Sequence, residues 1–191
     1  FDDMVINFGL RYDLFDPVSA LPSDRRNPAN QLSLPDSMMS AYPKADPQVQ
    51  ISPRFGLAYQ LGGSAILHFS YGHFFQMPPM YSLYQNHSFL VAPSDHATLM
   101  GNSELKAEKT ITYEVGLWQE LAKGMGLEVS LFYRDIYNLL STKVFSTYNQ
   151  IEYGLYSNKD YGNARGLEVK FDYNSGPISS WINYTLQYTR G

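Results

Sequence analysis

The chain has 191 residues, of which 44% are apolar and 15% aromatic, and its 14 basic and 18 acidic side chains give a net charge of −4. This composition is too apolar and too aromatic for a disordered chain, and it provides no basic field that would hold nucleic acid through phosphate contacts. No run of about 18 apolar residues occurs, which excludes a transmembrane helix but not membrane strands of about 10 alternating residues. The lack of cysteine excludes disulfides, thiolate catalysis and Cys-ligated zinc.

The first predicted element is a strand from Met4 to Leu14, where apolar side chains alternate strictly with the residues between them. A period of two places the apolar groups on one face of a strand, whereas a helix would scatter them round its axis. The same alternation predicts six further strands. They cover residues 54–61, 65–72, 111–118, 127–134, 166–173 and 181–188, and the fifth strand continues through Val144 to Tyr148.

The connections alternate between short and long. Hairpin sequences join the predicted strands at Gly62-Gly63, around Lys123-Gly124 and at 174–177, whereas residues 16–50, 75–108 and roughly 138–160 form long connections. An outer-membrane barrel has short periplasmic turns and long external loops, and this order favours such a barrel. A water-soluble antiparallel sheet with one buried face would show the same alternation within each strand.

The two faces of the predicted strands differ in chemistry. The apolar face ends in aromatic residues near the long loops, as in a lipid-interface girdle: Tyr12, Phe55, Tyr71, Tyr113, Tyr133 and Tyr188. The other face carries charges that we expect to face a polar lumen: Arg11, Arg54, Glu114, Arg134, Glu168 and Lys170. If the turn at Lys123-Gly124 sets the register, Glu114 lies opposite Arg134, where a cross-strand ion pair contributes about 0.2–1 kcal/mol.

The predicted fold is therefore all-β, an antiparallel up-and-down meander that forms part of a transmembrane β-barrel. Single-chain bacterial barrels close with an even number of strands, and seven is odd. We expect residues 1–191 to be one partial barrel domain, a fragment open at both edges.

Five segments resemble motifs of TonB-dependent outer-membrane receptors, in that family's order. They are Phe8–Asp13 ("GLRYD"), Ile51–Tyr59 ("SPRxGLxY"), Ser70–Pro79 ("SYGxxFxxPP"), Gly101–Gly116 ("GNPxLKPEKT…YExG") and Gly162–Glu168 ("NxGxARGxE"). Ser103 and Ala107 stand where that family's pattern has proline, which loosens the loop but leaves the strand start intact.

The resemblance implies a barrel of 22 strands, of which this chain supplies about seven, closed by an N-terminal plug that these residues lack. It implies a place in the outer membrane of a Gram-negative-type bacterium, contact with its lipid, and energy delivered by the TonB complex through the plug. It further implies import of a scarce solute, namely a siderophore or other iron chelate, cobalamin or an oligosaccharide.

Two long connections contain candidate ligand-binding residues. Aromatic rings offer a stacking face and amides read hydroxyl groups, which suits a sugar or a planar chelate. The candidates are Tyr81, Tyr84, Gln85 and Asn86 in the second long connection and Tyr148 and Asn149 in the third. The alternative is that these residues pack their own loops against neighbouring ones.

No catalytic or metal motif is present in the sequence. The four histidines, His68, His73, His87 and His96, the last beside Asp95, do not have the spacing of a metal site. There is no nucleophile elbow, phosphate-binding loop or placed carboxylate pair, so we expect neither enzyme activity nor a cofactor. The second function that the sequence allows is a soluble all-β module that binds carbohydrate through its aromatic loops.

Overall fold

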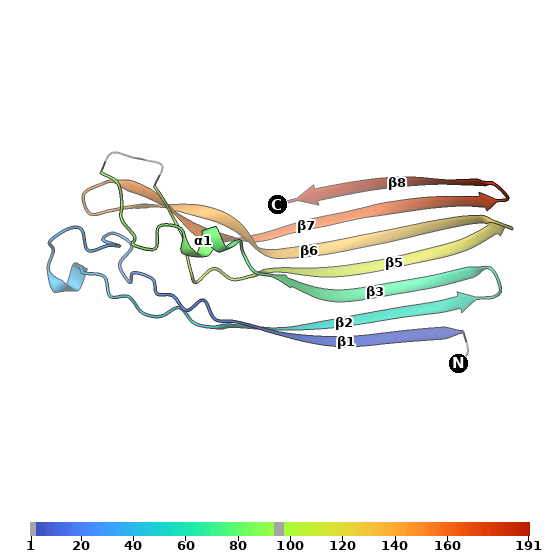
Figure 1. Ribbon diagram of the computed structural model, residues 1–191, viewed down its shortest axis with the longest axis horizontal. Helices are drawn as coiled ribbons and strands as arrows, with labels where there is room; N and C mark the ends of the chain where they lie inside the picture. Colours follow the sequence, from blue (N-terminus) through green and yellow to red (C-terminus); the bar gives the residue numbers. More distant parts are fainter. Residues whose placement is uncertain (1–2, 94–97) are drawn as a thin grey trace.

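A computed structural model describes residues 3–93 and 98–191, and it confirms the predicted antiparallel meander. The strands are β1 (Met4–Phe15), β2 (Gln48–Leu61), β3 (Ala65–Gln76), β5 (Glu108–Ala122), β6 (Met125–Ser146), β7 (Glu152–Ser175) and β8 (Ile178–Arg190). They lie side by side in chain order (Figure 1). The short β4 (Leu99–Met100) adds a parallel pairing to β7. The only helical segments among the described residues are α1 (Met80–Tyr84) and a 3-10 turn (Asp36–Met38), and no described helix is long and apolar enough to cross a membrane.

The short turns gather at one end of the sheet and the long connections at the other (Figure 1). Gly62, Gly124 and Gly176 sit in the three short turns with φ between 57° and 79°. Glycine adopts this left-handed backbone without the steric cost that other residues meet. This is why a glycine in a short connection between two strands indicates a hairpin.

The third long connection, predicted at 138–160, is instead mostly paired strand. β6 continues to Ser146 and β7 begins at Glu152, so the predicted continuation of the fifth strand is confirmed as far as Ser146. Asn138 takes a positive φ of 60°, yet pairing continues on both sides of it. The resulting hairpin extends about 26 Å beyond Asn138, at roughly 3.3 Å per residue.

The predicted register between β5 and β6 is wrong. Arg134 lies opposite Thr112, and Glu114 lies opposite Phe132. The pairing is interrupted between Glu120 and Ala122, where Leu121 is an extra residue on β5. The bulge shifts the ladder by one residue, and the tight turn that pairs Ala122 with Met125 accounts for the other residue of the error. Turn chemistry alone does not reveal a bulge.

Cysteine cross-linking tests this register directly, since the chain has no cysteine of its own. Directly opposite residues have Cα atoms about 4.5–5.5 Å apart, within disulfide range. We expect Thr112→Cys with Arg134→Cys to form a disulfide under mild oxidation, read by a gel shift that reductant reverses. Glu114→Cys with Arg134→Cys is the matched control, and more efficient cross-linking of this pair would contradict the structure.

One face of the sheet is an apolar band. Two rows of directly opposite residues across the strands form this band. The row next to the predicted girdle contains Ile6, Leu57, Phe69, Val115, Leu131, Leu167 and Leu186. The following row contains Met4, Tyr59, Leu67, Leu117, Val129, Val169 and Tyr184. Neither row contains a charged residue. Many of these side chains are solvent-exposed in the chain alone, Leu131 at 54% for example.

An aromatic row borders this band on the loop side. Phe8, Phe55, Tyr71, Tyr113, Tyr133, Arg165 and Tyr188 follow one another across the strands. Ring centroids are 5.1 Å apart for Tyr71 and Tyr113 and 6.5 Å apart for Tyr113 and Tyr133. Tyr12 was predicted to belong to this girdle, but it lies opposite Ile51, four residues along the strand from Phe8.

The other face of the sheet is polar. By register, the six charged residues expected to face a lumen, Arg11, Arg54, Glu114, Arg134, Glu168 and Lys170, all lie on it. Arg11 pairs with Asp13 at 2.7 Å and Lys170 with Asp172 at 3.6 Å, so these two charges are balanced locally along their own strands. The sheet thus separates an apolar surface from a charged one.

Candidate functional site

The long connections pack into one compact unit, which we call the loop head: residues 16–47, 77–93, 98–107 and 139–159 (Figure 1). Its core is formed by buried side chains from all three connections: Leu21, Phe89, Val91, Met100, Tyr153 and Leu155. Segments far apart in the sequence therefore share one hydrophobic cluster, and the loop head is an ordered structure.

Side-chain amides join the segments of the loop head by pairing with backbone groups. Gln31 accepts a hydrogen bond from the Val91 amide at 2.9 Å and donates to the Val91 carbonyl at 3.3 Å. Asn158 makes the same pair of bonds to Lys106, both at 2.9 Å. An amide side chain offers one donor and one acceptor, so it satisfies a loop backbone as a neighbouring strand would.

The tip of the long hairpin is clamped to the first connection. The Tyr148 hydroxyl donates to Asp24 at 2.9 Å, and the Arg26 guanidinium carbon lies 4.2 Å from the centre of the Tyr148 ring. The hydrogen bond to Asp24 raises the pKa of the Tyr148 phenol. Asn149 accepts a hydrogen bond from the Thr147 hydroxyl. Both predicted residues of this connection therefore have partners within the chain.

The predicted residues near α1 are also used to hold the loop. Tyr84 donates to the Pro17 carbonyl at 3.0 Å, the Gln85 carbonyl accepts from the Gly101 amide at 2.7 Å, and the Asn86 side chain donates to the Leu90 carbonyl at 2.8 Å. Tyr81 differs, since it is 56% exposed and packs edge-on against Tyr156 with centroids 5.9 Å apart. Ligand contact by these residues stays a prediction, and Tyr81 and Gln85 are exposed whereas Tyr84 and Asn86 are half-buried.

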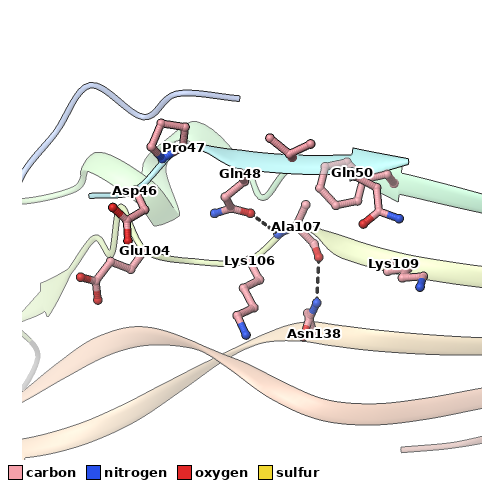
Figure 2. Close-up of a pocket in the computed structure, with 11 residues that line it drawn as sticks. Asp46, Pro47, Gln48, Gln50, Glu104, Lys106, Ala107, Lys109 and Asn138 are labelled. Carbon is pink, nitrogen blue, oxygen red and sulfur yellow. Dashed lines mark hydrogen bonds between the residues drawn. The ribbon is translucent and has the colours of Figure 1, made fainter. Parts of the chain in front are cut away.

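A cavity of about 520 Å³ opens where the loop head meets the sheet. The cavity forms because the pairing of β2 with β3 runs only from the Arg54–Gly72 pair to the turn at Gly62. On the loop side of that pair the two strands separate. Figure 2 shows Gln48 and Asn138 reaching Ala107 from opposite sides, with both hydrogen bonds at 3.1 Å. The wall combines acids, amides, lysines and apolar groups: Asp46, Gln48, Gln50, Phe75, Glu104, Lys106, Lys109 and Asn138.

Such a wall can hold a polar solute through several donors and acceptors around an apolar patch. Sequence reasoning missed these lining residues. Lys106 and Lys109 lie in the fourth motif, but nothing in that motif indicates a cavity. Gln48 and Asn138 are 90 residues apart and carry no motif at all, so only the fold brings them together.

Histidine and carboxylate groups do not assemble a metal centre in the described part of the chain. The closest approach is His68, whose Nε2 lies 3.9 Å from a carboxylate oxygen of Glu114 and 3.9 Å from one of Glu128. These distances suit weak ion pairs rather than coordination at about 2 Å. His96 and Asp95 lie outside the described residues.

Tyr153 gives the loop head a defined pH response. Burial raises the pKa of its phenol to about 12, and its hydroxyl donates to the Arg25 carbonyl at 2.7 Å. Because the pKa is higher in the folded state than the ordinary value of about 10, its stabilisation is complete below pH 10 and declines as pH rises toward 12. The loss is on the order of 3 kcal/mol.

We therefore expect protease resistance of the loop head to decline between pH 10 and 12. Tyr153→Phe should be less resistant than the wild type below pH 10, because the Arg25 carbonyl loses its donor, and its profile should be flatter above pH 10. Identical pH profiles for the two proteins would show that Tyr153 does not carry this response.

Comparison with known proteins places this architecture. The family model described as "TonB dependent receptor-like, beta-barrel" matches residues 1–191. The chain belongs to the TonB-dependent receptor β-barrel family. An uncharacterized TonB-dependent receptor of Haemophilus influenzae is 24% identical over 188 residues, which cover 98% of this chain and 44% of that protein. The chain thus spans less than half the length of the curated relative it matches.

Solved receptor structures share the fold. The Serratia marcescens hemophore receptor HasR, solved with its hemophore HasA and heme, has a TM-score of 0.67 and 19% identity, covering 97% of this chain and 32% of that chain. The siderophore receptor PirA from Acinetobacter baumannii has a TM-score of 0.65 and 15% identity, covering 98% and 26%. The FrpB iron transporter from Neisseria meningitidis has a TM-score of 0.60 and 15% identity, covering 98% and 23%.

Proposed function

We propose that this chain is part of the barrel wall of an outer-membrane receptor that imports a scarce solute with energy supplied through TonB. The observation that carries the proposal is the two-faced sheet in a chain of this family: an uncharged apolar band on one face and charged residues on the other. In this arrangement the band contacts lipid, and the polar face lines a lumen that a plug from another part of the receptor fills. The wall segment binds and guides solute and performs no chemistry.

The solute class that we favour is an iron chelate, rather than cobalamin or an oligosaccharide. The support is that the solved structures reported above are a siderophore receptor, an iron transporter and a hemophore receptor with heme. The loop head and the 520 Å³ cavity beneath it provide the external contact surface. Tyr81 is the predicted residue that we expect to meet the solute first.

The test is uptake by cells that express the full receptor. We expect the protein in the outer-membrane fraction, and uptake of radioactive iron that requires both this receptor and TonB. A protein found in the soluble fraction would favour the carbohydrate-binding module instead. Outer-membrane location without TonB-dependent uptake of any iron chelate would contradict the iron-chelate proposal and favour cobalamin or an oligosaccharide as the solute.

A further inference from the structure

The polar face holds a second cavity, of about 550 Å³, that lies across β2, β3, β5 and β6. Arg54, Gly72, Thr112 and Arg134 succeed one another along one cross-strand row. The two arginines therefore stand on either side of a floor made of glycine and threonine. Three strand spacings of about 4.8 Å separate their backbones by roughly 14 Å.

Each arginine is held against a phenylalanine ring. The guanidinium carbon of Arg54 lies 4.9 Å from the ring centre of Phe74, and that of Arg134 lies 4.8 Å from the ring centre of Phe132. Glycines make room for both rings, since a Cβ at Gly72 would come within 3.0 Å of Phe74 and one at Gly166 within 2.6 Å of Phe132. Stacking restrains each guanidinium plane and leaves its N–H groups available at the edge.

Neither arginine has an anionic partner among the described residues. Ion pairs within 4 Å involve Arg11, Arg25, His68 and Lys170 instead, and neither guanidinium donates a side-chain hydrogen bond in the described part of the chain. Glu114 lies opposite Phe132 rather than Arg134, and its carboxylate is 3.9 Å from the Nε2 of His68. Glu114 also lines this cavity, but its carboxylate forms no ion pair within 4 Å with either guanidinium. Two oriented cations thus flank a cavity that holds one acidic side chain.

We propose that Arg54 and Arg134 form a two-point anion site for a ligand that presents two or more carboxylate groups. A guanidinium matches a carboxylate with two parallel N–H donors, which gives both charge and geometry. The carboxylates come either from a polycarboxylate iron chelate in the lumen or from acidic side chains elsewhere in the receptor. The inference rests on the proposed function, because it takes the polar face as the lumen wall. If the solute supplies the carboxylates, the inference also narrows the solute to an anionic class.

The test uses the full receptor in detergent, with citrate and ferric citrate as probes in calorimetric titrations. If the solute supplies the carboxylates, Arg54→Gln and Arg134→Gln should each raise the Kd at least tenfold, and 0.5 M NaCl should weaken binding. Arg165→Gln, an exposed arginine on the opposite face, is the matched control and should leave the Kd unchanged. Binding that persists unchanged in the double variant would overturn the site.

If the wild type binds neither probe, thermal unfolding tests whether acidic side chains of the receptor itself occupy the site. A melting temperature that falls by several degrees in the double variant but not in Arg165→Gln, with the difference lost in 0.5 M NaCl, assigns the carboxylates to the receptor itself. No probe binding together with no salt-sensitive difference would overturn the proposal. Either failure leaves TonB-dependent uptake intact, so it is distinguishable from a failure of the proposed function.

Discussion

Tyr153→Ala is expected to unfold the loop head and leave the sheet assembled. Tyr153 is 1% exposed, stacks on Phe145 with ring centroids 5.9 Å apart, and satisfies the Arg25 carbonyl with its hydroxyl. Removing a buried aromatic ring of this size costs about 3–5 kcal/mol. One cluster of six buried side chains holds the described part of the loop head together, so we expect a loss of this magnitude to unfold it.

Hydrogen exchange of the full receptor in detergent measures this effect by segment. Peptides from 16–47, 98–107 and 145–155 should lose protection in Tyr153→Ala, while peptides within β3 and β5 keep it. Tyr81→Ala is the control, because Tyr81 is mostly exposed and its removal opens no cavity. Wild-type protection of the head in Tyr153→Ala would mean that the cluster does not hold the three connections together.

Leu167→Arg should destabilise the receptor in lipid far more than Glu168→Arg on the next residue. Leu167 lies in the apolar band opposite Leu131, whereas Glu168 lies on the polar face opposite Ser130. An arginine that faces lipid costs about 2–4 kcal/mol at the bilayer midplane and less toward the interfaces, whereas one that faces a polar lumen costs little. Urea unfolding in phospholipid vesicles gives the two free energies of unfolding. Equal costs for the two variants would contradict the assignment of faces.

The sequence predicts the strands well because a period of two is a local property. The residues of one strand are enough to tell its two faces apart. Gly62, Gly124 and Gly176 mark the turns, because each turn needs a left-handed backbone that glycine adopts without strain. The extent of β6 and β7 was harder to predict. The loop head covers the long hairpin, so residues on both of its faces pack or hydrogen-bond and no simple alternation marks residues 139–160 as strand.

The register and the sites depend on information that no local pattern contains. The predicted pairing of Glu114 with Arg134 differs from the observed register by two residues. The tight turn that pairs Ala122 with Met125 accounts for one of them, and the extra residue Leu121 accounts for the other. Tyr84 and Asn86 were predicted as ligand contacts from their chemistry alone, yet the same chemistry serves to satisfy loop carbonyls. Which use occurs depends on partners such as Pro17, 67 residues away.

The separation of the two faces in a membrane is the central claim, and a spin-label scan along β7 of the full receptor tests it most directly. Labels at successive positions from 165 to 172 are compared for collision with oxygen, which concentrates in lipid, and with a water-soluble nickel chelate. We predict that access alternates with a period of two. Oxygen access should be greatest at odd positions such as Leu167 and Val169, and access of the nickel chelate should occur only at even positions. Nickel access at the odd positions would place the apolar band in water and contradict the account.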